Sequence, residues 1–253
     1  MIDSHCHLTD PRLGEQLQAV LDRAAAAGVD QVITVGTSLD DDRRCVELCR
    51  QLPQVRCAIG IHPNYVVESK LEDVDEIESL QKDSSVVALG EMGLDYHYGQ
   101  ETKSRQREFF IRQLELAARF GRPVVIHCRE AVDDTLAILR DFATVPALFH
   151  CFTGTTPEAR RVIDAGYYLG FGGAVTFKKS EALREAAREV PADRFVMETD
   201  APYLTPEPMR KRKINEPAMV MHSAAVVAAA RGVEVEEIDR LSTANVRRFF
   251  GWG

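Results

Sequence analysis

Short apolar runs alternate with amphipathic helical patterns along the sequence, and this rhythm limits the fold more than any other feature. The runs are continuous rather than strictly alternating in polarity, as expected for strands that are buried on both faces. Eight such strand candidates occur: Met1–Cys6, Gln31–Val35, Val55–Ile61, Ser85–Leu89, Pro123–His127, Pro146–His150, Tyr167–Phe171 and Arg194–Glu198.

Helical stretches with one apolar face lie between these runs. They are Leu13–Ala27, Asp40–Gln51, Leu71–Lys82, Lys103–Phe120, Ala131–Phe142, Pro157–Ala165 and Lys178–Val190. Thr156 followed by Pro157 predicts a capped helix start, and Gly121 predicts a helix end. Eight β-α units in 253 residues predict an α/β fold, a (β/α)8 TIM-type barrel, as a single domain over residues 1–253. An open doubly wound sheet is the alternative, weakened because no GxGxxG motif follows the first run.

Composition excludes several classes of protein. Hydrophobic residues make up 45% of the chain, enough to bury a large core without disulfides. The net charge of −8 argues against broad non-specific binding to nucleic acid, but it allows a nucleic-acid substrate held by metal ions. Six cysteines without a CxxC pair predict free thiols. With no run of 18 apolar residues and no signal-peptide pattern, we expect a cytoplasmic protein with no membrane contact and no obligate protein partner.

Potential metal ligands stand at the ends of most predicted strands. In a β/α barrel these carboxyl ends converge on one face, where active sites lie. Only two of the seven histidines, His97 and His222, fall outside this pattern. The ligand-type residues at strand ends are His5, His7, His62, Glu91, His127, His150 and Asp200.

This set of side chains predicts a divalent-metal site. His5 and His7 are two apart on a strand, so their side chains share one face. Imidazole with carboxylate suits zinc, manganese or iron, and a site richer in carboxylate and water also accepts magnesium. A carboxylate can bridge two metals about 3.5–4 Å apart, and Glu91 is the best candidate for that role. Asp200 can bind one metal and accept the proton of the attacking water.

Several longer motifs resemble the TatD family of metal-dependent hydrolases, within the amidohydrolase-like barrel superfamily. Together they cover residues 3 to 217, nearly the whole chain. The matching stretches are Asp3–Leu8, Gly60–Pro63, Gly90–Tyr96, Gln106–Phe110, Pro123–Arg129, His150–Gly154, Glu198–Leu204 and Asn215–Pro217. The resemblance implies a distorted TIM barrel that carries a divalent-metal hydrolase.

The resemblance also implies ligand sets and an activity. His5, His7, Glu91 and Asp200 would hold one metal ion, and Glu91, His127 and His150 the second, with Mg, Mn or Zn as candidates. Such proteins are commonly assigned as deoxyribonucleases, often 3′→5′ exonucleases on single-stranded DNA. Some relatives act on D-aminoacyl-tRNA, so ester hydrolysis on tRNA is the alternative. A barrel with a purely structural metal is a third hypothesis, which predicts a closed ligand shell.

Three further residues are candidates for holding the substrate: His62, Arg129 and Asn215. His62 either contacts a phosphate or a leaving group, or it is a turn histidine bonded to the backbone. Arg129 either pairs with a phosphate through its planar fork or joins a structural ion pair with Glu130 or Asp133. The basic run 210–213 departs from the family pattern and either guides a nucleic-acid strand or forms a solvated loop. His97 is interpreted as a surface residue.

Overall fold

The structure is a computed structural model that describes residues 1–252, and it divides the chain into two compact units. The first unit comprises residues 1–34 with residues from 151 onward, and the second comprises residues 35–150. Each unit is described separately below. The expectation of a single domain over 1–253 stays a prediction.

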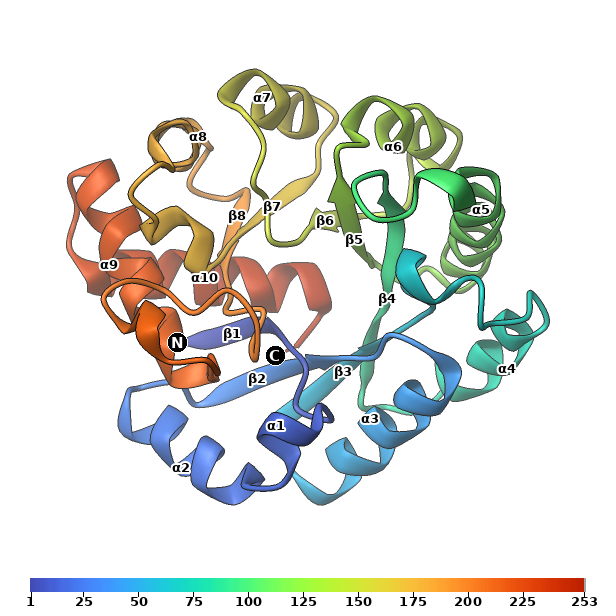
Figure 1. Ribbon diagram of the computed structural model, residues 1–253, viewed down its shortest axis with the longest axis horizontal. Helices are drawn as coiled ribbons and strands as arrows, with labels where there is room; N and C mark the ends of the chain where they lie inside the picture. The colour runs from blue at the N-terminus through green and yellow to red at the C-terminus, as the bar shows by residue number, and fades with distance from the viewer. Residues whose placement is uncertain (253) are drawn as a thin grey trace. The chain divides into compact units, whose positions relative to one another are not determined.

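The first unit holds four strands and six α-helices. They are β1 (Ile2–Cys6), α1 (Pro11–Gly14), α2 (Leu17–Ala26), β2 (Gln31–Val35), α7 (Thr156–Asp164), β7 (Tyr168–Phe171), α8 (Glu181–Glu189), β8 (Phe195–Met197), α9 (Val220–Arg231) and α10 (Val235–Phe250). The last residue of β2 belongs to the second unit. In that second unit, strands and helices alternate in the same way. They are α3 (Leu39–Gln51), β3 (Val55–Ile59), α4 (Asp73–Leu80), β4 (Val86–Asp95), α5 (Lys103–Phe120), β5 (Val124–Arg129), α6 (Val132–Leu139) and β6 (Ala147–Phe149). Within this unit α3 packs on β3, and α5 packs on β4 (Figure 1).

All eight strands belong to one parallel sheet, in chain order from β1 to β8. Within the first unit, Cys6 at the end of β1 forms a parallel bridge with Ala201, just beyond β8. The first and last strands of the order are therefore neighbours. This topology confirms the predicted (β/α)8 class and excludes the doubly wound sheet, whose strand order reverses at a switch point.

The fourth strand is longer than the sequence predicts. β4 runs to Asp95 and pairs with β5 as far as Arg129, whereas the prediction ended it at Leu89. Glycines interrupt the apolar pattern there. Gly93 has a φ of +140°, and a Cβ at this position would lie 2.1 Å from the His127 carbonyl oxygen, so only glycine permits the close approach. Glu91 therefore lies inside the strand rather than at its end.

Two details of the helices also differ from the prediction. The N-cap of α7 is Thr155 rather than Thr156, because Thr155 and Glu158 form a reciprocal capping box. Two helices, α9 and α10, follow β8 without a strand between them, and the alternation of strands and helices does not predict them. Gly121 ends α5 in the left-handed conformation, with a φ of 63°, as predicted.

The strands are buried on both faces, as their continuous apolar runs predict. Every residue of β1 and of β4 is buried. All six cysteines are free, four of them buried, which confirms the expectation of free thiols. The four buried cysteines therefore contribute packing in the core, and none of the six forms a disulfide.

Asp42 on α3 is a fully buried carboxyl in the second unit. Its Oδ1 accepts a hydrogen bond from the Gly60 amide at 3.0 Å, and its Oδ2 has no hydrogen-bond partner among residues 1–252. Burial raises the pKa of Asp42 well above its usual range, against the lowering influence of the Gly60 hydrogen bond; Asp41 and Cys57 raise it further. At a pH between the usual carboxyl pKa and this raised value, the folded protein holds a proton at Asp42 that the unfolded chain releases.

A pH-dependent stability difference between wild type and Asp42→Asn is expected. The pKa of Asp42 is higher in the folded state than in the unfolded state. Below about pH 4 the carboxyl is protonated in both states and does not change the free energy of unfolding. As the pH rises from there toward the folded pKa, the free energy of unfolding falls. The asparagine side chain keeps the acceptor for the Gly60 amide and cannot ionise. We expect wild type to lose up to about 1.4 kcal/mol per pH unit relative to the variant above about pH 5. Urea unfolding of both proteins from pH 5 to 8 measures this; parallel curves would contradict it.

Candidate metal centre

Two histidines and an aspartate gather in the first unit, at the carboxyl ends of β1 and β8. His5 lies in β1, His7 follows that strand, and Asp200 lies just beyond β8. The two Nε2 atoms are 3.4 Å apart. Asp200 Oδ1 is 3.8 Å from His5 Nε2 and 3.4 Å from His7 Nε2. These three side chains are close enough to hold one metal ion.

Backbone hydrogen bonds between the ends of β1 and β8 set the positions of these ligands. The Asp200 amide donates to the His5 carbonyl at 2.9 Å, and the His7 amide donates to the Ala201 carbonyl at 2.7 Å. Asp200 adopts a φ of 57°, which an aspartate tolerates better than most residues. The parallel pairing therefore places the aspartate opposite the two histidines.

Asn215, predicted to bind substrate, is fully buried in this unit. Its Nδ2 donates to the Thr199 carbonyl at 2.9 Å and to the Tyr203 carbonyl at 2.7 Å. These two residues lie on either side of Asp200 along the chain. Asn215 thus holds the turn that carries Asp200, and a direct contact with substrate stays a prediction.

Glu91 is the centre of a second cluster, within the second unit. Its Oε1 lies 2.6 Å from His150 Nε2, 2.7 Å from His127 Nδ1 and 3.3 Å from His62 Nε2. His127 Nδ1 is also 3.2 Å from His62 Nε2 and 3.4 Å from His150 Nε2. The structure therefore brings three predicted ligands of this unit together with His62.

Electrostatics keep the Glu91 carboxylate ionised despite its burial. Burial raises the pKa of Glu91, but His150, His62 and His127 together lower it more, so the pKa lies well below its usual range. Burial lowers the pKa of His127, yet hydrogen bonds to Asp95 and Glu91 raise it to about 9. Burial is the main influence on His62 and leaves its pKa below the usual value. The cluster thus offers one anionic oxygen among imidazole nitrogens.

His62 forms the turn contact, which is one of the two roles left open for it. Its Nδ1 accepts a hydrogen bond from the Asn64 amide at 3.0 Å, which is the turn contact. Because Nδ1 accepts, the ring proton lies on Nε2, which faces the Glu91 Oε1 acceptor at 3.3 Å. Whether Nε2 contacts substrate stays a prediction.

Asp95 is a functional candidate that the sequence analysis missed. Its Oδ2 lies 3.1 Å from His127 Nε2, on the opposite side of the ring from Glu91. Burial raises the pKa of Asp95, but His127 and the Tyr98 and His97 amides lower it more, so the net shift is downward. A carboxylate behind a ligand histidine fixes the ring orientation and its tautomer. Asp95 lies in the Gly90–Tyr96 stretch that resembles the family, and its contact with His127 follows from the extension of β4 to this residue.

Two buried glutamines on α5 hold the backbone around this cluster. Gln106 Oε1 accepts from the Asp95 amide at 2.8 Å, and its Nε2 donates to the Asp95 carbonyl at 3.0 Å. Gln113 binds Ile61, the residue before His62, in the same way. Its Oε1 accepts from the Ile61 amide at 2.8 Å, and its Nε2 donates to the Ile61 carbonyl at 3.1 Å. Each glutamine satisfies both backbone groups of one residue, so α5 fixes both Asp95 and the approach to His62.

Arg129 belongs to the second unit, and the basic run 210–213 belongs to the first. Arg129 ends β5, and its guanidinium carbon lies 4.7 Å from the centre of the Tyr98 ring. Glu130, one of its suggested ion-pair partners, pairs with His97 at 2.8 Å. In the basic run of the first unit, the guanidinium carbon of Arg210 lies 3.6 Å from the centre of the Phe177 ring. The phosphate-binding role of Arg129 stays a prediction.

Comparison with known proteins identifies the family. The model of the family described as TatD related DNase matches residues 2–251. The chain belongs to this family. The uncharacterized metal-dependent hydrolase YcfH of Escherichia coli strain K12 is 40% identical over 99% of this chain and 95% of its own length. The 3'-5' ssDNA/RNA exonuclease TatD of Klebsiella pneumoniae strain 342 is 35% identical, covering 99% and 98%.

A solved structure agrees with this assignment. The crystal structure of YJJV, a TatD homologue from Escherichia coli K12, matches with a TM-score of 0.94 and 28% identity, over 100% of this chain and 98% of that one. The TatD-family chain is therefore a metal-dependent hydrolase, an enzyme of the class that acts on ester bonds.

The donor atoms of this TatD-family protein fit a divalent metal. Two ligands about 2.0–2.1 Å from a tetrahedral ion lie about 3.3 Å apart. The His5 and His7 Nε2 atoms are 3.4 Å apart, and the His150 Nε2 and His127 Nδ1 atoms are also 3.4 Å apart. Imidazole nitrogens brought this close together beside a carboxylate are poor partners for one another but suitable ligands for a shared cation.

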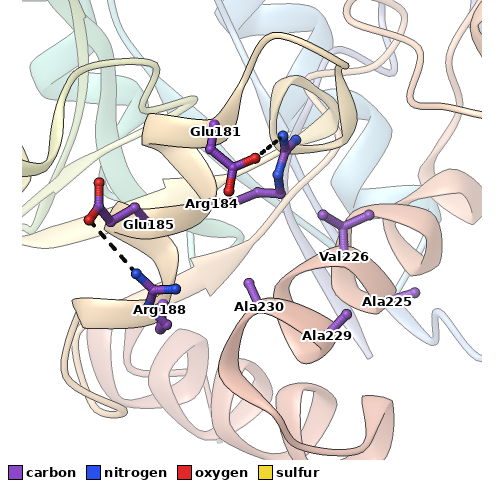
Figure 2. A pocket seen from close by; sticks show the side chains of 8 residues that line it. All are labelled: Glu181, Arg184, Glu185, Arg188, Ala225, Val226, Ala229 and Ala230. Atoms are coloured by element: carbon purple, nitrogen blue, oxygen red, sulfur yellow. Dashed lines mark hydrogen bonds and ion pairs between the residues drawn. The ribbon is translucent and has the colours of Figure 1, made fainter.

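Other features of the TatD-family chain lie outside these clusters. A pocket of about 310 Å³ between α8 and α9 is lined by residues that the sequence analysis did not select, and its charges are paired along α8 (Figure 2). Glu181 pairs with Arg184 at 2.8 Å and Glu185 with Arg188 at 3.7 Å. Among residues 1–252 no single helix is long and apolar enough to cross a membrane, and one bent helix pair, 217–231 with 235–250, meets that test jointly.

Proposed function

We propose that the protein is a divalent-metal-dependent deoxyribonuclease, a 3′→5′ exonuclease on single-stranded DNA. The observation that carries the proposal is the Glu91 cluster, in which nitrogen atoms of three histidines lie within 3.3 Å of one carboxylate oxygen. The TatD relative from Klebsiella pneumoniae, named as an exonuclease on single-stranded DNA and RNA, supports a nucleic-acid substrate.

Two divalent metal ions, Mg, Mn or Zn, are proposed as the cofactors. His5, His7 and Asp200 would hold one ion within the first unit, and Glu91, His127 and His150 would hold another within the second. Bound ions of this type supply an activated water and neutralise charge on the phosphate oxygens. The role of Glu91 as a ligand shared by both ions joins residues of the two units and stays a prediction.

The side chains themselves have separate tasks in this proposal. Asp200 accepts the proton of the attacking water through a carboxylate oxygen. Arg129, with its planar set of donors, and His62 hold the phosphate, while the basic run 210–213 guides the strand by its charge. A cytoplasmic location and the lack of an obligate protein partner also stay predictions.

Product analysis on two substrates tests the proposal. The protein is stripped with a chelator, reloaded with Mg²⁺ or Mn²⁺ and incubated with 5′-labelled single-stranded DNA or with D-aminoacyl-tRNA. We expect the DNA to shorten stepwise from its 3′ end, and only when metal is present. Intact DNA together with metal-dependent release of the amino acid from tRNA would replace the nuclease by an esterase. Intact DNA and intact aminoacyl-tRNA at full metal loading would contradict both assignments.

A further inference from the structure

Three of the six tyrosines are exposed, and each follows the carboxyl end of a strand: Tyr65 follows β3, Tyr98 follows β4 and Tyr203 follows β8. Tyr65, Tyr98 and Tyr203 have exposed fractions of 45%, 69% and 48%. Each ring lies against a histidine, with centroid distances of 6.2, 4.6 and 5.9 Å to His62, His97 and His7. The remaining tyrosines, Tyr96, Tyr167 and Tyr168, are buried. Two of these rings thus lie against histidines of the candidate site, and the third, Tyr98, lies against His97.

Tyr98 is the most exposed of the three, yet its backbone is firmly held. The Tyr98 and His97 amides both donate to Asp95 Oδ1 at 2.9 Å. The other oxygen of that carboxylate faces His127 Nε2 at 3.1 Å. Gln106 holds the same segment through the carbonyls of Asp95 and Gly99. The Tyr98 ring is therefore exposed to solvent while its backbone is fixed. The Asp95 carboxylate that binds the Tyr98 amide also contacts His127, a metal-ligand candidate.

Arg129 completes the arrangement from the neighbouring strand. It lies two residues after His127 on β5, so both side chains emerge on the same face of the strand. Its guanidinium lies 4.7 Å from the centre of the Tyr98 ring. An exposed aromatic ring beside an arginine is the combination that holds single-stranded nucleic acid without sequence preference, through base stacking and phosphate contacts.

We propose that Tyr98 and Arg129 form a nucleobase-stacking subsite, in which a base adjoining the hydrolysed phosphodiester stacks on Tyr98 while Arg129 donates to its phosphate. This inference rests on the proposed nuclease function, and it identifies the nucleobase next to the hydrolysed phosphodiester as the part of the substrate that Tyr98 contacts. Because every base has a π face, the subsite tolerates any sequence.

Binding of fluorescein-labelled single-stranded oligonucleotides tests the subsite without requiring cleavage. Fluorescence anisotropy is followed with Ca²⁺ in place of Mg²⁺, using a normal strand and a strand of equal length whose 3′-terminal residues are abasic. We expect Tyr98→Ala to weaken binding of the normal strand about tenfold, which equals about 1.4 kcal/mol and is typical of one stacked base. Binding of the abasic strand should be unchanged, and Tyr98→Phe, which keeps the ring, should bind both strands like wild type.

Phe120→Ala is the matched control. Phe120 is also an exposed aromatic residue beside an arginine, with Arg119 lying 5.1 Å from its ring centre, but it lies at the far end of α5. It should bind like wild type. Equal losses on both strands for Tyr98→Ala, no loss, or a wild type that binds neither strand would overturn the subsite. Base-dependent binding without DNA cleavage in Mg²⁺ would support the subsite and overturn the exonuclease proposal alone.

Discussion

Glu91→Ala protein, stripped of metal and reloaded with Mg²⁺ or Mn²⁺, is expected to release no nucleotide from single-stranded DNA above background. The substitution removes the ionised oxygen that nitrogen atoms of His62, His127 and His150 surround within 3.3 Å. The three imidazoles then lose the anion that they share, although His127 keeps the Asp95 carboxylate at 3.1 Å. Loss of several kcal/mol of metal-based stabilisation corresponds to a rate at least about a thousandfold lower.

Metal content measured on the same samples shows whether the loss of activity comes from a loss of bound metal. We expect the variant to retain fewer metal equivalents than wild type after gel filtration, measured by atomic emission. Glu189→Ala, which removes a carboxylate that pairs with Arg160 on the helix surface, is the control and should keep full activity. A Glu91→Ala protein with wild-type turnover and metal content would remove Glu91 from the site.

Asp200→Asn is expected to lose turnover while remaining folded. Asparagine keeps the shape of the side chain and one oxygen toward His5 and His7 but accepts no proton at neutral pH. We expect kcat to fall about a hundredfold to ten-thousandfold, the usual contribution of a positioned base, with a smaller change in KM. The midpoint of thermal unfolding should stay within about 4 °C of wild type.

The same substitution at Asp193 is the control for Asp200→Asn. Asp193 is more than half exposed and pairs with Arg194, so Asp193→Asn should leave kcat unchanged. If Asp200→Asn retains wild-type kcat, the proton passes to another group. If the variant unfolds instead, the aspartate serves the fold, as the hypothesis of a purely structural metal requires.

The fold class is predictable because it depends on a pattern repeated along the chain. Eight apolar runs separated by amphipathic stretches leave few alternatives, and ligand-type residues at the strand ends stand out against this background. The prediction is wrong where a pattern breaks for a local reason. The glycines of β4 interrupt the apolar run, so the prediction ends the strand at Leu89 although pairing continues to Asp95.

The supporting residues of the site are harder to predict because their partners are distant in sequence. Gln113 bonds to Ile61, 52 residues away, and Asp95 lies against His127, 32 residues away. No local periodicity encodes such pairs. A glutamine on an otherwise apolar helix face is one sequence signal, and it indicates a polar partner without naming it.

The two glutamine contacts make α5 a spacer of fixed length. Gln106 and Gln113 are seven residues apart, so they lie on one face of the helix, separated by about 10.5 Å along its axis. A single inserted residue between them would turn Gln113 about 100° away from Ile61, whereas one inserted after Gln113 would leave both contacts intact. Among related sequences, we therefore expect insertions and deletions between Gln106 and Gln113 to be rare, even where the exposed residues of this segment vary.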